Sequence, residues 1–161
     1  MGSSFVVIDS ALVQVDLPAA ARGLARHYRV GPAQRGYDDP SFMHVVEAFD
    51  GIGLRPYGPT HLRASRESGG DLQVSWVRRT RIGGDSWASE EVPLGEARED
   101  YRVRVGQGGT IRREVDLSQP SWTYSAAAQA SDGVTPGFTV EVAQVSETFG
   151  SGPYTRITIN D

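Results

Sequence analysis

Apolar and polar residues alternate most regularly over residues 72–77. Leu72, Val74 and Trp76 project to one side of an extended chain there, and the residues between them project to the other. A two-residue period of this kind predicts a β-strand with one face in a hydrophobic core. The alternation stops after these residues, and the polar, glycine-containing segment 78–100 is predicted to be a long loop.

The same alternation recurs through the rest of the C-terminal part of the chain. It predicts six further strands, at residues 61–65, 101–105, 111–115, 122–124, 138–142 and 154–159. Glycine-rich turns separate several of them. Seven short strands with a tryptophan on the second are typical of an immunoglobulin-like β-sandwich, so we expect a mainly β fold.

The N-terminal part has shorter and less regular elements. We expect a helix over 19–28 and strands at residues 5–8, 11–15 and 42–49. Two prolines and a glycine in the segment 54–59 predict an extended linker. We therefore divide the chain into a small α+β segment, 1–57, which we interpret as the C-terminal remnant of a preceding domain, and a β-sandwich, 58–161.

Composition narrows the classes of function. The chain has 161 residues, a net charge of −4, sixteen basic residues that are all arginine, and no cysteine. The absence of a basic excess argues against a nucleic-acid partner. No apolar run approaches eighteen residues, and no basic segment precedes the first apolar run, so we expect neither membrane insertion nor a signal peptide.

The apolar positions of the predicted strands also match a known family. The matching motifs are Pro59-x-x-Leu62, Leu72-x-Val74-x-Trp76, Tyr101-x-Val103, Phe138-x-Val140-x-Val142-Ala143 and Phe149-Gly150-x-Gly152-Pro153. They resemble a fibronectin type III domain, in which these residues fill the core between two sheets. Phe138 departs from the pattern, because the family has a tyrosine there whose hydroxyl makes a corner hydrogen bond.

A second resemblance spans nearly the whole chain. Its motifs are Pro18–Pro32, Gly53–Pro56 with His61–Ala64, Trp76–Trp87 and Val92–Glu96. Together they resemble the C-terminal part of the host-specificity, or tail-hub, protein of gene transfer agents and related siphophage-like prophages of alphaproteobacteria. The resemblance implies a piece of a far larger protein at the distal end of a phage-like tail, assembled in the bacterial cytoplasm and extracellular after release.

The same resemblance implies partners but no chemistry. The partners would be other tail or baseplate proteins and a bacterial surface glycan or protein receptor. The resemblance supplies no catalytic residue and no cofactor.

The 78–100 loop carries the candidate binding residues, which are Arg78, Arg79, Arg81 and Trp87. Planar cations beside an aromatic ring are enriched at binding hot spots and at sugar-stacking surfaces. The alternative is structural: the arginines pair with the acidic residues that follow in the loop, and the tryptophan caps the end of the sandwich.

One segment, Gly84-Asp85-Ser86, suggests an esterase. A nucleophilic serine needs a histidine base, and the esterase family with this motif places that base near its C-terminus. Here all three histidines, His27, His44 and His61, precede Ser86, so we interpret the segment as a turn and predict no catalytic residue. Scattered histidines without cysteine also predict no metal site and no cofactor.

Two non-catalytic functions remain. The first is a structural or host-recognition module of a phage-like tail tip. The alternative is an accessory carbohydrate- or protein-binding domain of a secreted polysaccharide-degrading enzyme. The fold by itself does not choose between them.

Overall fold

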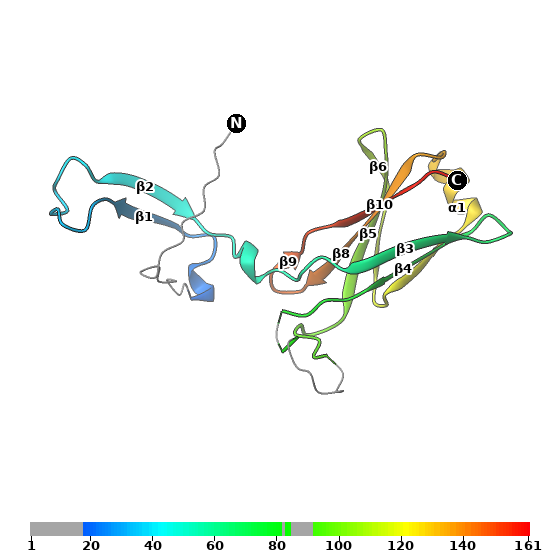
Figure 1. Ribbon diagram of the computed structural model, residues 1–161, viewed down its shortest axis with the longest axis horizontal. Helices are drawn as coiled ribbons and strands as arrows, with labels where there is room; N and C mark the ends of the chain where they lie inside the picture. The colour runs from blue at the N-terminus through cyan, green and yellow to red at the C-terminus, as the bar shows by residue number, and fades with distance from the viewer. Residues whose placement is uncertain (1–17, 82, 85–91) are drawn as a thin grey trace. The chain divides into compact units, whose positions relative to one another are not determined.

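A computed structural model describes residues 18–81, 83–84 and 92–161 of the chain (Figure 1). It divides into two compact units, Met1–Gly51 and Ile52–Asp161. The strands predicted at 5–8 and 11–15 lie outside the described residues.

The first unit contains a β-hairpin. A 3-10 turn, η1 (Ala19–Ala21), is followed by strand β1 (Ala25–Val30), which pairs antiparallel with β2 (Met43–Ala48). The strand predicted at 42–49 is confirmed, and the helix predicted over 19–28 is wrong.

The reason for the error lies at Gly23. Its φ of +72° belongs to the left-handed region, and its N–H donates to the carbonyl of Phe49 at 3.0 Å. This conformation ends the helical turn, and the following residues, which include Tyr28 and Val30, pair with β2. Pairing with a distant strand therefore overrides the local helix preference of the alanines.

The second unit holds every strand predicted after residue 58. After a 3-10 turn, η2 (Ile52–Leu54), its strands are β3 (Thr60–Arg66), β4 (Leu72–Val77), β5 (Asp100–Gln107), β6 (Thr110–Leu117), β7 (Ser121–Tyr124), β8 (Phe138–Ser146), β9 (Gly150–Ser151) and β10 (Thr155–Ile159). One sheet has the order β3-β4-β7, and the other has the order β10-β8-β5-β6 with β9 beside β8. All pairs are antiparallel.

The inner faces of the two sheets form the core. Its fully buried side chains come from alternate positions of the strands and include Leu72, Val74, Tyr101, Val103, Val105, Tyr124, Phe138, Val140 and Val142. Trp76 is 4% exposed and packs edge to face against Tyr101, with ring centroids 5.2 Å apart. The predicted mainly β, fibronectin type III-like sandwich is confirmed.

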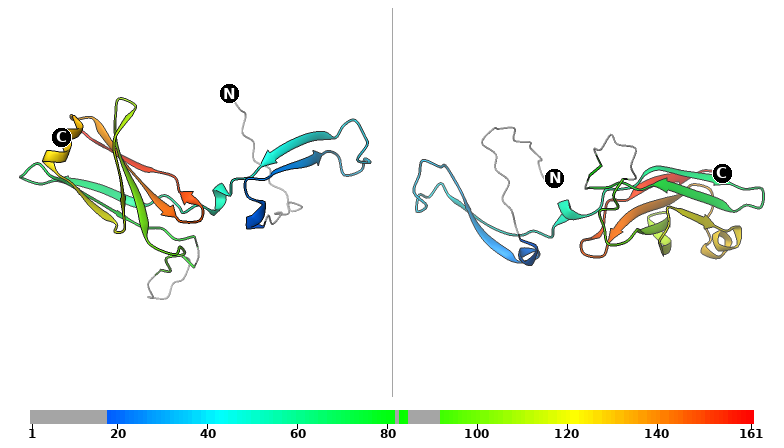
Figure 2. Two further views of the ribbon diagram at one scale, coloured as in Figure 1. Left: turned by 180° about the vertical axis from the view of Figure 1, so that it is seen from behind. Right: turned by 90° about the horizontal axis from the view of Figure 1, so that it is seen from below.

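The sequence did not predict a helix between β7 and β8. Helix α1 (Ala126–Asp132) begins after Ser125, whose side chain accepts a hydrogen bond from the N–H of Ala128, and it ends at left-handed Gly133. Figures 1 and 2 show α1 near the C-terminus, at the end of the sandwich opposite the described residues of the 78–99 loop.

Asp132, the last residue of helix α1, accepts hydrogen bonds from two neighbouring strands. The hydroxyl of buried Tyr124 donates to Asp132 Oδ2 at 2.5 Å, and Arg113 of β6 donates to both oxygens of the same carboxylate at 2.6 and 2.9 Å. This network joins β6, β7 and α1. Phe138 has no hydroxyl and therefore makes no tyrosine-corner bond. Burial and the hydrogen bond to Asp132 raise the pKa of Tyr124.

The predicted linker packs onto the second unit. Pro56 and Pro59 are buried, and Thr155 Oγ1 donates to the carbonyl of Pro59 at 2.6 Å. Gly152 lies so close to this segment that a Cβ there would be 2.2 Å from the Pro56 carbonyl oxygen. The compact unit therefore begins at Ile52, whereas the prolines had suggested residue 58.

Candidate functional site

The three predicted arginines have different roles in the structure. Arg78 donates to the carbonyls of Val92 and Pro93, the latter at 3.1 Å, so it ties the start of the loop to its later part. Arg81 pairs with Glu96 at 2.9 Å, and their side chains are only 17% and 13% exposed. These two side chains hold the loop, and Trp87 lies outside the described residues.

Other contacts fix the end of the same loop. The hydroxyl of Tyr101 donates to Glu99 at 2.6 Å. Burial, together with this carboxylate, raises the pKa of Tyr101, so the phenol stays protonated as a donor.

Arg79 is the exposed residue among the three arginines, whereas Arg78 and Arg81 are partly buried. Its backbone N–H donates to Gln144 Oε1 at 2.6 Å, and Gln144 Nε2 donates back to its carbonyl at 2.8 Å. Gln144 lies on β8 and is 5% exposed, so the amide acts as a buried bridge that fixes this backbone. The guanidinium lies over the ring of Tyr57, 5.0 Å from its centroid.

A β-bulge lies beside this pair, at the start of β3. Thr60 pairs with Val77 and Arg63 with Ser75, so β3 carries one extra residue between these partners. His61 takes up the bulge with a φ of +51°, a left-handed conformation that non-glycine residues adopt infrequently. Bulges of this kind redirect a side chain, and here the side chain is an exposed imidazole.

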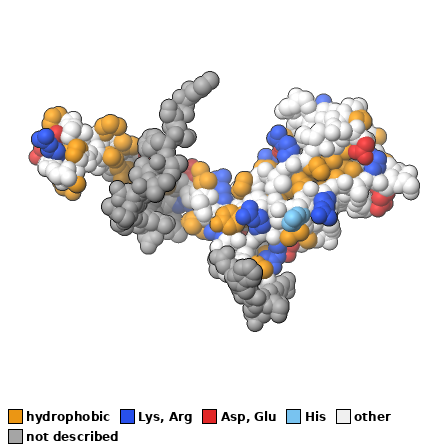
Figure 3. Space-filling view, viewed as in Figure 1, with side chains coloured by type: hydrophobic (Ala, Val, Ile, Leu, Met, Phe, Trp, Pro, Cys, Tyr) orange, Lys and Arg blue, Asp and Glu red, His pale blue; other side chains and the backbone are white. Residues whose placement is uncertain are grey.

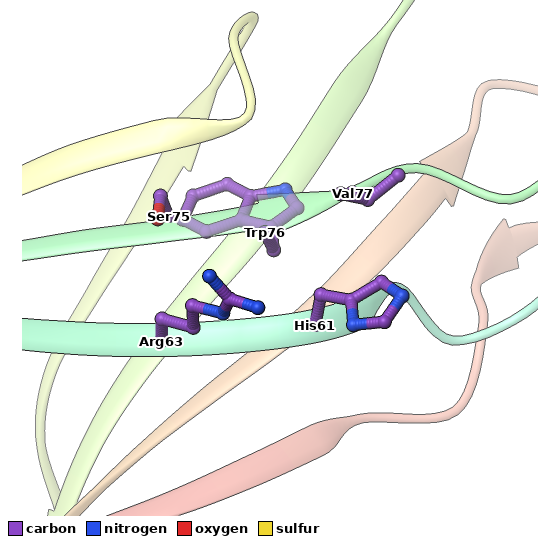
Figure 4. Close-up of a pocket in the computed structure, with 5 residues that line it drawn as sticks. All are labelled: His61, Arg63, Ser75, Trp76 and Val77. Carbon is purple, nitrogen blue, oxygen red and sulfur yellow. The ribbon is translucent and has the colours of Figure 1, made fainter.

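A surface hollow of about 300 Å³ opens between the two strands at the bulge (Figure 4). His61 and Arg63 approach it from β3, and Ser75, Trp76 and Val77 line it from β4. Figure 4 shows the guanidinium of Arg63 turned toward the β4 side chains and the imidazole near Val77. The hollow therefore combines two basic groups with an apolar wall.

We use the name β3–β4 corner for the set Tyr57, His61, Arg63, Val77 and Arg79. Tyr57 and Val77 are 46% and 51% exposed. Within the residues that the structure describes, no carboxylate forms a salt bridge with either arginine of the corner. Figure 3 shows arginines flanking a histidine on the visible face of the sandwich. The corner thus offers unneutralised cations beside apolar and aromatic surface.

The outer face of the other sheet is different. A row of charges crosses its four strands in the order Glu114, Arg104, Glu141, Arg156. Arg104 donates to Glu114 at 2.6 Å, and Arg156 donates to Glu141 at 2.6 Å. These cations are already neutralised, so this face is a weaker candidate for binding an anion.

Sequence reasoning found Arg79 but missed the rest of the corner. The alternation predicted the strand at 61–65 that carries His61 and Arg63, but it did not single out either side chain. It gave no sign of the extra residue in β3, because a bulge shows only in the pairing register. Tyr57 was assigned to a linker, and its position beneath Arg79 depends on packing between distant segments.

No group of three or more His, Cys, Asp or Glu side chains is placed to hold a metal ion within 18–81, 83–84 and 92–161. Asp85 and Ser86 of the esterase-like motif lie outside the described residues. In the same part of the chain, no helix is long and apolar enough to cross a membrane.

Comparisons with known proteins bear on the fold. No protein-family model and no curated protein matches the chain. The chain is similar to domains d3-d4 of the rat CD45 extracellular region, with 9% identity over 98% of this chain and 75% of that one, and a TM-score of 0.45. It is also similar to the FN5 domain of Drosophila Lar, with 15% identity over 66% and 98% and a TM-score of 0.38.

A third similar structure is the spore cortex lytic enzyme SleM of Clostridium perfringens. The identity is 11%, over 77% of this chain and 36% of the enzyme, and the TM-score is 0.43. At such identities and TM-scores the fold assignment rests on the strand order itself, and no function is transferred.

Proposed function

We propose that this chain is a non-enzymatic recognition module at the distal end of a phage-like tail, of the gene transfer agent type that its sequence resembles. In this proposal it contacts the bacterial surface through the β3–β4 corner. The sequence motifs support the tail location, and the chemistry of the corner supports a binding role.

One observation carries the binding role. Arg79 presents an exposed guanidinium over the ring of Tyr57, while its backbone is fixed by the buried amide of Gln144. A side chain whose backbone is already held loses less conformational entropy when it binds. Arginine and tyrosine are also enriched among the residues that contribute most to binding interfaces.

The charge of the corner selects the ligand class. A guanidinium binds carboxylates and phosphates with two parallel hydrogen bonds. Arg63 and His61 add donors at the rim of the neighbouring hollow, and Val77 adds apolar surface. This set fits an anionic surface glycan, one that carries uronate or phosphate groups, better than a neutral sugar.

The test is binding of the fluorescently labelled chain to intact cells of a panel of alphaproteobacteria. We expect saturable binding to some strains, and Arg79→Ala should weaken it by about ten-fold, or roughly 1.4 kcal/mol. Arg156→Ala on the opposite sheet removes the same charge and should leave binding unchanged.

Three results would decide against the proposal or move the site. Absence of binding to every strain, even by a multimerised chain, would remove the recognition role. Binding that persists in an Arg79→Ala, Tyr57→Ala double variant would move the site away from the corner. Binding to purified plant polysaccharide, without a preference for any bacterial strain, would favour the accessory-domain alternative.

A further inference from the structure

We propose that His27 and His44 form a binding site for a divalent cation of intermediate softness, such as Zn²⁺ or Ni²⁺. The two residues lie on neighbouring strands of the first unit. His27 is paired with Val46 and His44 with Arg29, so the two histidines are diagonal neighbours on one face of the hairpin.

One ring nitrogen of each histidine already lies close to a ring nitrogen of the other. Nδ1 of His27 lies 2.9 Å from Nε2 of His44, and the ring planes are 10° apart. The ring centroids are 5.0 Å apart, so they are much farther from each other than the two nitrogens are. The nitrogens therefore meet at the near edges of the rings, where one donates a proton and the other accepts it through a lone pair.

A metal ion can take the place of that shared proton. Neutral imidazole is a preferred ligand of zinc, nickel and copper. Two nitrogens bound to one tetrahedral Zn²⁺ at about 2.0–2.1 Å lie roughly 3.3 Å apart. The pair needs to open by only about 0.4 Å to reach that geometry, and both side chains are exposed.

The surroundings leave room for the ion. The next residue pair on this face is Ala25 and Ala48, whose side chains are small. Arg29 lies opposite His44, but its guanidinium donates to the carbonyl of Tyr37 and is thereby held toward the hairpin loop. Since no group of three ligands forms within the described residues, water would complete the coordination. Two nitrogen ligands also argue against Ca²⁺ and Mg²⁺, which prefer oxygen.

The ion would clamp the hairpin. A two-stranded ribbon is only marginally stable in water, because it has no second layer to bury its apolar side chains. A metal bound to one histidine from each strand favours the paired register and stabilises it by mass action.

The experiment is titration of the full 161-residue chain with ZnCl₂, followed by calorimetry and by the amide resonances of β1 and β2. We expect one ion per chain, with affinity reduced at least about ten-fold in His27→Gln and in His44→Gln. His61→Gln, which removes the histidine of the sandwich, is the matched control and should bind as the unmodified chain does.

Several results would overturn the site. The first is that the unmodified chain shows no saturable zinc binding. The second is that both hairpin variants bind zinc as tightly as the unmodified chain. The third is that His61→Gln loses zinc binding. Resonance shifts confined to residues outside β1 and β2 would also exclude it.

Discussion

The hairpin and the sandwich are built from strands of similar length but very different burial. In β5 every second side chain from Tyr101 to Val105 is buried, with 1% or less exposed. In the hairpin, Val30 and Met43 are 60% and 67% exposed although they are paired with each other. Strand pairing alone satisfies the backbone, whereas burial of side chains requires a second layer.

This difference also separates the two candidate sites. The sandwich core fixes the backbone at Arg79 through Gln144 and leaves the guanidinium outside. In the hairpin, the cross-strand register places the two histidines beside each other. A bound ion would help to stabilise the hairpin, as the hydrophobic core stabilises the sandwich.

The largest effect is expected in the core. Trp76→Ala should lower the free energy of unfolding of the sandwich by about 3–5 kcal/mol, because a large buried ring is replaced by a cavity. Val77→Ala on the same strand removes a side chain that is 51% exposed and should cost about 0.5 kcal/mol or less. Urea unfolding followed by circular dichroism measures both, and equal losses would show that alternate burial does not govern stability here.

A smaller effect is expected at the network of Asp132. Asp132→Asn weakens the hydrogen bonds from Arg113 and Tyr124 and should cost about 1.5 kcal/mol at neutral pH. The exposed pair of Arg102 and Asp116 offers the control, since Asp116→Asn should cost about 0.5 kcal/mol or less.

The pH dependence provides an independent check of this network. The hydrogen bond from Arg113 lowers the pKa of Asp132, so the contribution of its carboxylate is complete above the pKa of an unfolded aspartate, about 3.9. It is lost as the pH falls through the lower pKa of the folded state. Stability curves of the unmodified chain and Asp132→Asn should therefore converge in strong acid. Curves that stay parallel at all pH values would contradict this role.

The smallest effect is expected on the outer charged face. Glu114→Gln should change the free energy of unfolding by less than about 0.5 kcal/mol, because its side chain is 40% exposed and its partners are screened by water. The change should shrink further in 1 M salt. A loss comparable to that of Asp132→Asn would show that the charge row stabilises the sheet as a network.

The sequence determined the strands of the sandwich and the faces they bury. Alternation is a local property with a period of two, so Leu72, Val74 and Trp76 were readable as core before any partner was known. Arg79 was found because it belongs to a local run of arginines, Arg78, Arg79 and Arg81, that lies close to a tryptophan in the sequence.

Tertiary structure decided what depends on distant partners. Ala25–Val30 became a strand because β2 was available to pair with it, and His61 entered a bulge because the register of β3 against β4 required an extra residue. The pairs Arg79 with Tyr57 and His27 with His44 each join residues that the sequence separates by many positions. Such contacts arise from pairing register and sheet packing, which no local pattern of residues encodes.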